Sequence, residues 1–126
     1  MEHPVSVNTL GALVTLGLGV FGLFSPHGVA QFVGIQPDGE RGVSEIRATY
    51  GGLFLALGLF AIVAQNSEVF RAVGVAWIGA ASARCYSYVR DNSRSGATLG
   101  AIVMEAVIGL SARRPLHTPR WPPDGC

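Results

Sequence analysis

Two ionisable side chains, Arg84 and Glu105, lie inside otherwise apolar stretches of this sequence. Arg84 interrupts the stretch at residues 72–89, and Glu105 interrupts the stretch at residues 95–112. A charge near the middle of a membrane span costs at least about 2.5–3.5 kcal/mol, so residues of this kind are functional candidates. We predict Glu105 as a catalytic general acid or base and Arg84 as its electrostatic partner. The alternative is an ion pair with a structural role only.

A second group of candidates lies at the start of the charge-free stretch at residues 48–67 and just before it. Arg47, Tyr50 and Gly51 share a helix face by their spacing, and Arg47 and Tyr50 are predicted to bind the polar end of a substrate. Glu45 is a further catalytic candidate. Each has a structural alternative: Glu45 as a first-turn acid, Arg47 extending to the membrane surface, and Tyr50 as an interfacial aromatic.

Four more residues are candidates because of where they would lie. Asp91 follows the third apolar stretch and is a catalytic candidate, with a loop or capping role as the alternative. Trp77 and Tyr88 share the helix face of Arg84 and are predicted to contact substrate, by stacking in the case of Trp77; ordinary packing is the alternative. His27 is predicted to line the rim of the same site.

Composition argues against several other kinds of chemistry. The three histidines, His3, His27 and His117, are scattered and have no cysteine partner at ligand spacing, so we expect no metal site. We expect no cofactor. The net charge is +1 and no long basic run occurs, so nucleic acid is not an expected partner.

The apolar stretches predict the elements that position these residues. A bilayer core needs about 20 helical residues to cross it. We therefore predict an all-α integral membrane four-helix bundle of up-down-up-down order, with spans at residues 5–24, 44–64, 68–89 and 97–112. Ser44 and Ser67 are the expected helix caps of the second and third spans.

The remaining segments are short. Residues 27–35 are too few to cross a membrane and are predicted to lie at the interface or to form a short helix across the mouth of the bundle. Residues 1–112 form the predicted transmembrane domain. Residues 113–126 form a proline-rich tail that we expect to be extended.

In such a bundle the candidates converge on one side of the membrane. Arg84 lies about 9 Å and Glu105 about 13 Å below the loop that joins their helices, at 1.5 Å per residue. The two side chains can therefore meet. Thr98, Ala101 and Glu105 form a stripe on the fourth span, which predicts a polar pocket open toward the loops.

At residues 45–52 the sequence reads EIRATYGG. This motif resembles the signature of a family of small four-span membrane proteins catalogued as domain of unknown function 4345, and the resemblance extends over about residues 5–110. Arg84, Asp91 and Glu105 match polar positions of that family. The loop after Asp91 departs from the family pattern. The resemblance implies a membrane protein with a shared polar site and does not imply a particular reaction.

We therefore expect a multi-pass protein of the bacterial inner membrane, with cytoplasmic termini favoured slightly by the arginine distribution. The favoured function is an enzyme that isomerises or cyclises a lipophilic small molecule, such as a terpenoid, polyketide or steroid-like compound, by acid–base chemistry. One alternative is a non-enzymatic membrane subunit or lipid-binding module. Another is a small proton-coupled transporter. The sequence is also compatible with a homo-oligomer in which a second copy of the chain completes the pocket.

Overall fold

The computed structural model describes residues 7–112, and this part of the chain is helical with short connections. The predicted all-helical class is confirmed. The predicted tail at residues 113–126 lies outside the described residues. In chain order the elements are α1 (Val7–Phe24), α2 (Pro26–Val33), α3 (Gly39–Ile46), the π-helix η1 (Arg47–Leu53), α4 (Phe54–Ala64), α5 (Ser67–Arg90) and α6 (Gly96–Ser111).

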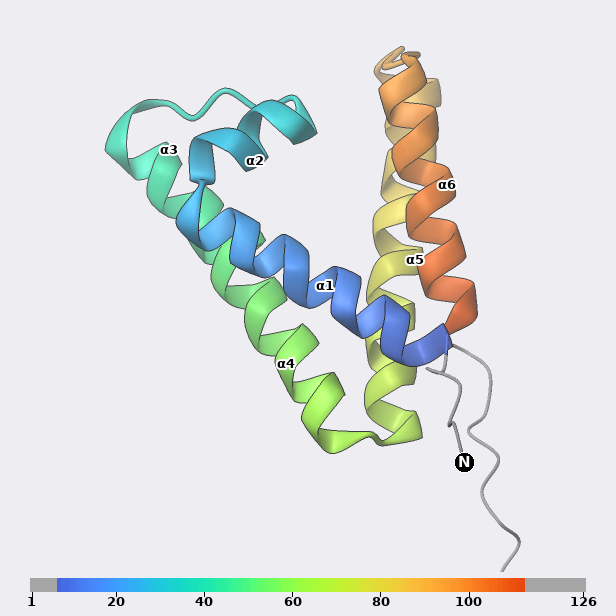
Figure 1. Cartoon of the computed structure of the whole chain (residues 1–126). Helices are drawn as coiled ribbons and strands as arrows, with labels where there is room; N and C mark the ends of the chain where they lie inside the picture. The colour runs from blue at the N-terminus through green and yellow to red at the C-terminus, as the bar shows by residue number, and fades with distance from the viewer. Residues whose placement is uncertain (1–6, 113–126) are drawn as a thin grey trace, which may run out of the picture.

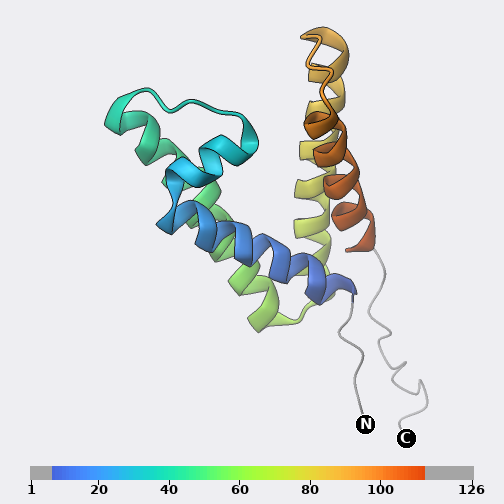
Figure 2. The same cartoon turned by 45° about the horizontal axis from the view of Figure 1, so that its top comes forward.

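The helices form two arms that meet at one end of the molecule and diverge toward the other (Figure 1). In the first arm, α1 packs along η1 and α4, and α2 and α3 lie at its far end. The second arm is the pair of α5 and α6. The turned view in Figure 2 shows the same separation. Successive long segments run in alternating directions, but the two arms pack against each other at one end only, so the predicted four-helix bundle is not confirmed.

Glycine allows the helices of the first arm to pack backbone against backbone. A Cβ atom added at Gly22 would overlap the backbone of Tyr50, and one added at Gly51 would lie 2.8 Å from the backbone nitrogen of Leu23. Contacts of this kind are typical of helix pairs in membranes, where small residues let the backbones approach closely. The close approach fixes η1 against the end of α1.

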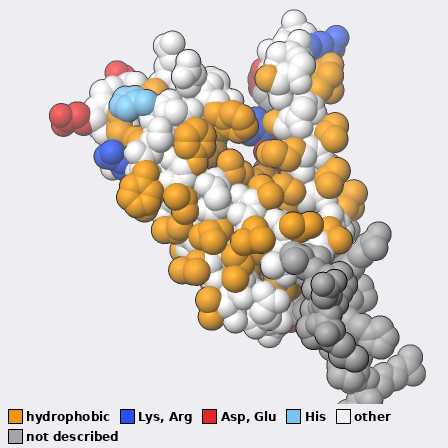
Figure 3. Space-filling model, in the orientation of Figure 1, with side chains coloured by type: hydrophobic (Ala, Val, Ile, Leu, Met, Phe, Trp, Pro, Cys, Tyr) orange, Lys and Arg blue, Asp and Glu red, His pale blue; other side chains and the backbone are white. Residues whose placement is uncertain are grey.

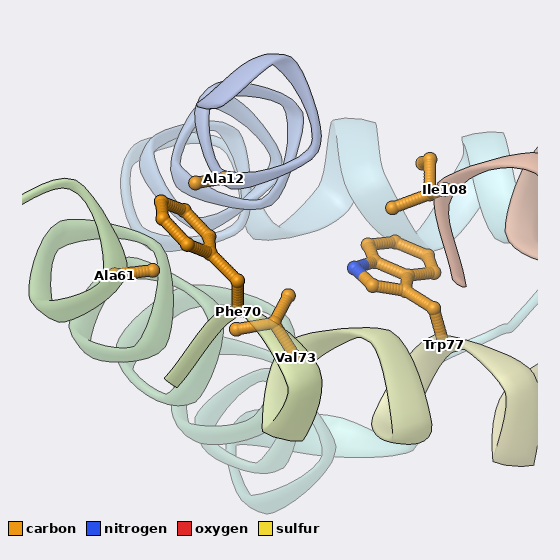
Figure 4. Close-up of a cluster of buried hydrophobic side chains, with 6 residues drawn as sticks. All are labelled: Ala12, Ala61, Phe70, Val73, Trp77 and Ile108. Atoms are coloured by element: carbon orange, nitrogen blue, oxygen red, sulfur yellow. The ribbon is translucent and has the colours of Figure 1, made fainter. Parts of the chain in front are cut away.

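The hydrophobic core lies where the two arms meet. It joins side chains from α1, α4, α5 and α6, which converge in Figure 4: Ala12, Ala61, Phe70, Val73, Trp77 and Ile108. A smaller cluster of Val29, Ala30 and Ile46 holds α2 against α3 at the far end of the first arm. The main core therefore joins the two arms at one end of the molecule, and the smaller cluster stabilises the opposite end of the first arm.

Two predicted helix starts need correction. The second long helical segment begins at Gly39 and continues without a break to Ala64, so Ser44 does not cap it. Glu45 consequently lies near the end of α3, and Glu40 is the acid in the first turn. For α5 the cap is Asn66, whose side chain accepts a hydrogen bond from the Glu68 amide at 2.8 Å. Asparagine caps a helix at least as well as serine does.

Two helical stretches are long and apolar enough to cross a membrane, judged by length and composition alone: Val7–Phe24 and Gly39–Ala64. Helix α6 is apolar but has 16 residues. Large hydrophobic side chains are exposed on both arms, including Phe24 at 78%, Val63 at 74% and Val89 at 73%. Hydrophobic side chains cover much of the face shown in Figure 3.

Candidate functional site

A cavity of about 740 Å³ lies between the two arms, and the space-filling view shows the molecule hollowed there (Figure 3). Its volume is within the range of sites that bind small molecules. The first arm contributes residues from α1, α2, η1 and α4, including Leu18, Phe32, Tyr50 and Phe54. The second arm contributes residues from α5 and α6, including Trp77, Arg84, Thr98, Met104 and Glu105.

The expected contact between Arg84 and Glu105 is present at the wall of this cavity. The Arg84 Nε donates a hydrogen bond of 2.7 Å to Glu105 Oε1. The Glu105 side chain is 5% exposed and that of Arg84 is 34% exposed. The pairing arises because α5 and α6 are antiparallel and joined by a short loop, which brings the two residues to similar depths.

The second carboxylate oxygen of Glu105 has an unusual environment. Glu105 Oε2 is buried and has no hydrogen-bond partner among the described residues. An unsatisfied buried polar group costs about 1–3 kcal/mol, and more when it is charged. Glu105 lines the cavity, but Oε2 itself is buried, so a molecule bound there can supply the missing donor when the Glu105 side chain turns toward the cavity. This oxygen is the feature that most clearly distinguishes the cavity from a packing defect.

An aromatic wall of three rings also lines the cavity, with Tyr50 and Phe54 on the first arm and Trp77 on the second. The Tyr50 and Phe54 ring centroids are 5.9 Å apart, and those of Phe54 and Trp77 are 5.6 Å apart. Trp77 Nε1 donates to Thr15 Oγ1 at 2.9 Å, and Thr15 Oγ1 donates to the Gly11 carbonyl at 2.8 Å. These two bonds hold the Trp77 ring at the point where the core meets the cavity.

The π-helix separates two residues that were predicted to act together. Tyr50 lines the cavity, whereas Arg47 Nε donates to the Leu23 carbonyl at 3.3 Å, at the end of α1. Gly51 also packs on Leu23. A π-helix bonds residue i to i+5 and has a wider turn than an α-helix, so the spacing that predicts a shared face for Arg47 and Tyr50 does not apply. Arg47 does not line the cavity, so it does not share a face with Tyr50, and its role in binding substrate stays a prediction.

Four other candidates lie away from the cavity. Asp91 is exposed and accepts a hydrogen bond from Ser87 Oγ at 2.8 Å. The guanidinium of Arg94 lies 5.7 Å from the centre of the Tyr88 ring. Glu45 is exposed on α3, and His27 is exposed beside a smaller cavity next to α2. The structure therefore brings together Tyr50, Trp77, Arg84 and Glu105 of the predicted residues, and does not bring Glu45, Arg47, Tyr88, Asp91 or His27 to them.

Several cavity residues were not predicted. Helix α2 contributes Gln31 and Phe32, and η1 contributes Thr49. A signal for α2 was available in the sequence, because Pro26 at its start and Gly34 at its end, with φ +77°, are the residues expected at the two ends of a helix. No group of three His, Cys, Asp or Glu side chains that could hold a metal occurs within residues 7–112.

These features define an all-helical protein with a partly buried ion pair at the wall of a largely apolar cavity. The chain belongs to the family described as Domain of unknown function (DUF4345), whose model matches residues 7–113. The match includes every described helix. No curated protein and no solved structure matches the chain.

Proposed function

We propose that this protein is a membrane-embedded enzyme that isomerises or cyclises a lipophilic small molecule by acid–base chemistry, without a redox cofactor. The observation that carries the proposal is the Glu105 carboxylate. It is buried at the wall of an apolar cavity, paired with Arg84 through Oε1, and has no partner at Oε2. An ion pair with its carboxylate buried gives little net stability compared with apolar packing, which favours a functional role.

The proposal places four helical segments across the membrane. Helices α1 and the continuous α3–η1–α4 segment have the necessary length and composition. Helix α5 has 24 residues, or about 36 Å. Arg84 and Glu105 neutralise each other, which lowers the cost of placing them in lipid. Exposed apolar side chains on both arms support the same arrangement. We place both termini on the cytoplasmic side of a bacterial inner membrane.

In the proposed mechanism Glu105 moves a proton. Its Oε2 removes a proton from a carbon beside a carbonyl group. The electron pair of the broken C–H bond forms a C=C bond to the carbonyl carbon, and the π pair of the carbonyl moves onto its oxygen. The terminal N–H groups of Arg84 stabilise that negative charge. The Glu105 carboxyl exchanges this proton with water and then delivers a proton to a different carbon. The aromatic wall of Tyr50, Phe54 and Trp77 shapes the apolar part of the substrate.

Proton transfer can be detected before the substrate is known. Membranes that contain the protein are incubated in D₂O with a lipid extract of the source cells, and the products are compared by high-resolution mass spectrometry. We expect at least one lipophilic molecule to acquire deuterium with the wild-type protein. Glu105→Gln should abolish this uptake, because glutamine does not accept the proton.

The chain supplies a matched control. Glu68 pairs with Arg71 at 3.0 Å on the exposed surface, and neither residue lines the cavity. Glu68→Gln should therefore leave deuterium uptake unchanged. Equal uptake by the wild type and Glu105→Gln, or no uptake by either, would rule out Glu105 as the acid or base.

One observation favours a second candidate, a lipid-binding protein that performs no reaction. Most of the residues around the cavity are apolar, and the two arms diverge beside it. A lipophilic molecule that copurifies with the wild-type protein but exchanges no deuterium would support this alternative.

A further inference from the structure

We infer that the cavity selects uncharged molecules in which a hydrogen-bond donor lies beside an acceptor, such as a primary amide or a hydroxyketone, attached to an apolar chain. The inference rests on the proposed function in that it concerns the same site and names its ligand class. It does not require that the bound molecule react.

The first argument is charge. Among the described residues around the cavity, Arg84 and Glu105 are the ones that carry formal charge, and they are bonded to each other. The wall therefore has no net charge. An anionic ligand would face Glu105, and a cationic ligand would face Arg84. Either would also lose its hydration on entering a largely apolar cavity without gaining a counter-ion of its own.

The second argument is hydrogen bonding. Glu105 Oε2 lacks a donor. A guanidinium has five N–H donors, and the described contacts of Arg84 use its Nε. When the Glu105 side chain turns toward the cavity, the pair offers one acceptor, Oε2, beside unused donors of Arg84. A group that itself carries a donor next to an acceptor can satisfy both at once, whereas a simple ether or ester can satisfy only the arginine.

The third argument is the shape of the remaining wall. Phe32, Phe54, Trp77 and Met104 line the cavity, so the rest of the ligand must be apolar. Gln31, Thr49 and Thr98 also line it. These side chains can hydrogen-bond with a ligand but carry no charge, so they do not change the preference for an uncharged group.

Fluorescence of Trp77 can test the inference directly. The chain has two tryptophans, and Trp121→Phe leaves Trp77 as the one reporter. The protein in lipid nanodiscs is titrated near neutral pH with ω-bromoundecyl probes that differ only in the head group: amide, sulfonate and primary amine. Bromine quenches a tryptophan that it contacts. We expect saturable quenching by the amide at a mole fraction in lipid about tenfold lower than for either charged probe.

Variants of the ion pair should reverse this preference in opposite directions. Glu105→Gln leaves Arg84 uncompensated, so the sulfonate should bind better than the amide. Arg84→Gln leaves Glu105 uncompensated, so the amine should bind better, and this variant also serves if Glu105→Gln does not fold. Glu68→Gln removes a similar charge from the exposed surface and should leave the order of the probes unchanged.

The inference is overturned if the wild-type protein binds a charged probe as well as the amide, if none of the probes gives saturable quenching, or if the order of probes is the same in a folded ion-pair variant. Its failure is distinguishable from failure of the proposed function. Selective amide binding without deuterium uptake would support the inferred ligand class and contradict the proposed catalytic activity. Glu105-dependent deuterium uptake without selective binding would support the catalytic activity and contradict the inferred ligand class.

Discussion

The Arg84–Glu105 pair joins two helices that already have a close packing contact. A Cβ atom added at Gly109 would lie 2.9 Å from the Gly74 carbonyl, so α5 and α6 are in near-backbone contact away from the ion pair. Helix association therefore does not require the pair. Burying Glu105 with one oxygen unsatisfied costs free energy. A role in binding or catalysis explains this cost more simply than a role in holding α5 and α6 together.

The energetics of the pair can be separated from those of its members. Arg84→Met leaves a buried unpaired carboxylate and should lower the free energy of unfolding by about 3–5 kcal/mol. Adding Glu105→Leu should recover much of that loss, because the double variant buries no charge. The measurement is a double-mutant cycle of denaturant unfolding in detergent. Simple addition of the two single losses would show that the side chains are not coupled.

The hydrogen bond between Trp77 and Thr15 should also contribute to stability. Thr15→Val keeps the shape of the side chain but leaves the indole N–H without its acceptor, so we expect a loss of about 1–3 kcal/mol. Unfolding is followed by Trp77 fluorescence in the Trp121→Phe background. Ser82→Ala is the control, because Ser82 makes a similar hydroxyl-to-carbonyl bond on the exposed face of α5 and should change stability by less than about 0.5 kcal/mol.

At the scale of elements, hydropathy and helical geometry predict the four long helical segments and the contact between Arg84 and Glu105. The contact follows from counting residues back from a short loop, and this depends on local geometry alone. The π-helix is different. No residue type within Arg47–Leu53 requires an i to i+5 pattern; the path of η1 depends on packing against α1 at Gly51, which is a tertiary contact. The separation of Arg47 from Tyr50 could therefore not be predicted from the spacing of residues in the sequence.

Adjacent glycines in η1 provide a test of that packing. Gly51→Ala would place a Cβ atom 2.8 Å from the backbone of Leu23, and we expect it to destabilise the protein by about 1–3 kcal/mol. At Gly52 the nearest atom to an added Cβ is the Arg47 carbonyl at 3.8 Å. Gly52→Ala should therefore be neutral or stabilise by up to about 1 kcal/mol.

Thermal unfolding of the two alanine variants in detergent compares them directly. Equal stability of the two variants would contradict the assignment of Gly51 to the helix contact. The pair also controls for the intrinsic helix preference of alanine, which is the same at both positions.

At the scale of the whole molecule, the two arms share one core at their joined end, and the cavity lies where they separate. The extent to which the arms diverge was not predictable from the sequence, because apolar stretches of similar length are equally compatible with a closed bundle. Because the arms separate at this end, the short helix α2, which connects the two long segments of the first arm, also borders the cavity through Gln31 and Phe32.

The exposed thiol of Cys85 on α5 can test whether this helix lies in lipid. In a Cys126→Ser background, a water-soluble maleimide should fail to label Cys85 in intact membranes and should label it after solubilisation in SDS. Thiolate formation requires water, which the hydrocarbon excludes. Glu40→Cys, at an exposed position in the first turn of α3, should react in membranes and is the positive control. Equal labelling at both positions would place α5 in water.

The divergence of the arms has a further consequence if the molecule lies in a bilayer. A wedge-shaped opening surrounded by hydrocarbon fills with the acyl tails of neighbouring phospholipids, so any guest has to compete with them. Binding would then depend on the membrane as much as on the guest: saturated, well-ordered tails enter such an opening less readily than kinked, fluid ones. The same protein should thus hold a given guest more tightly in a stiff bilayer than in a soft one.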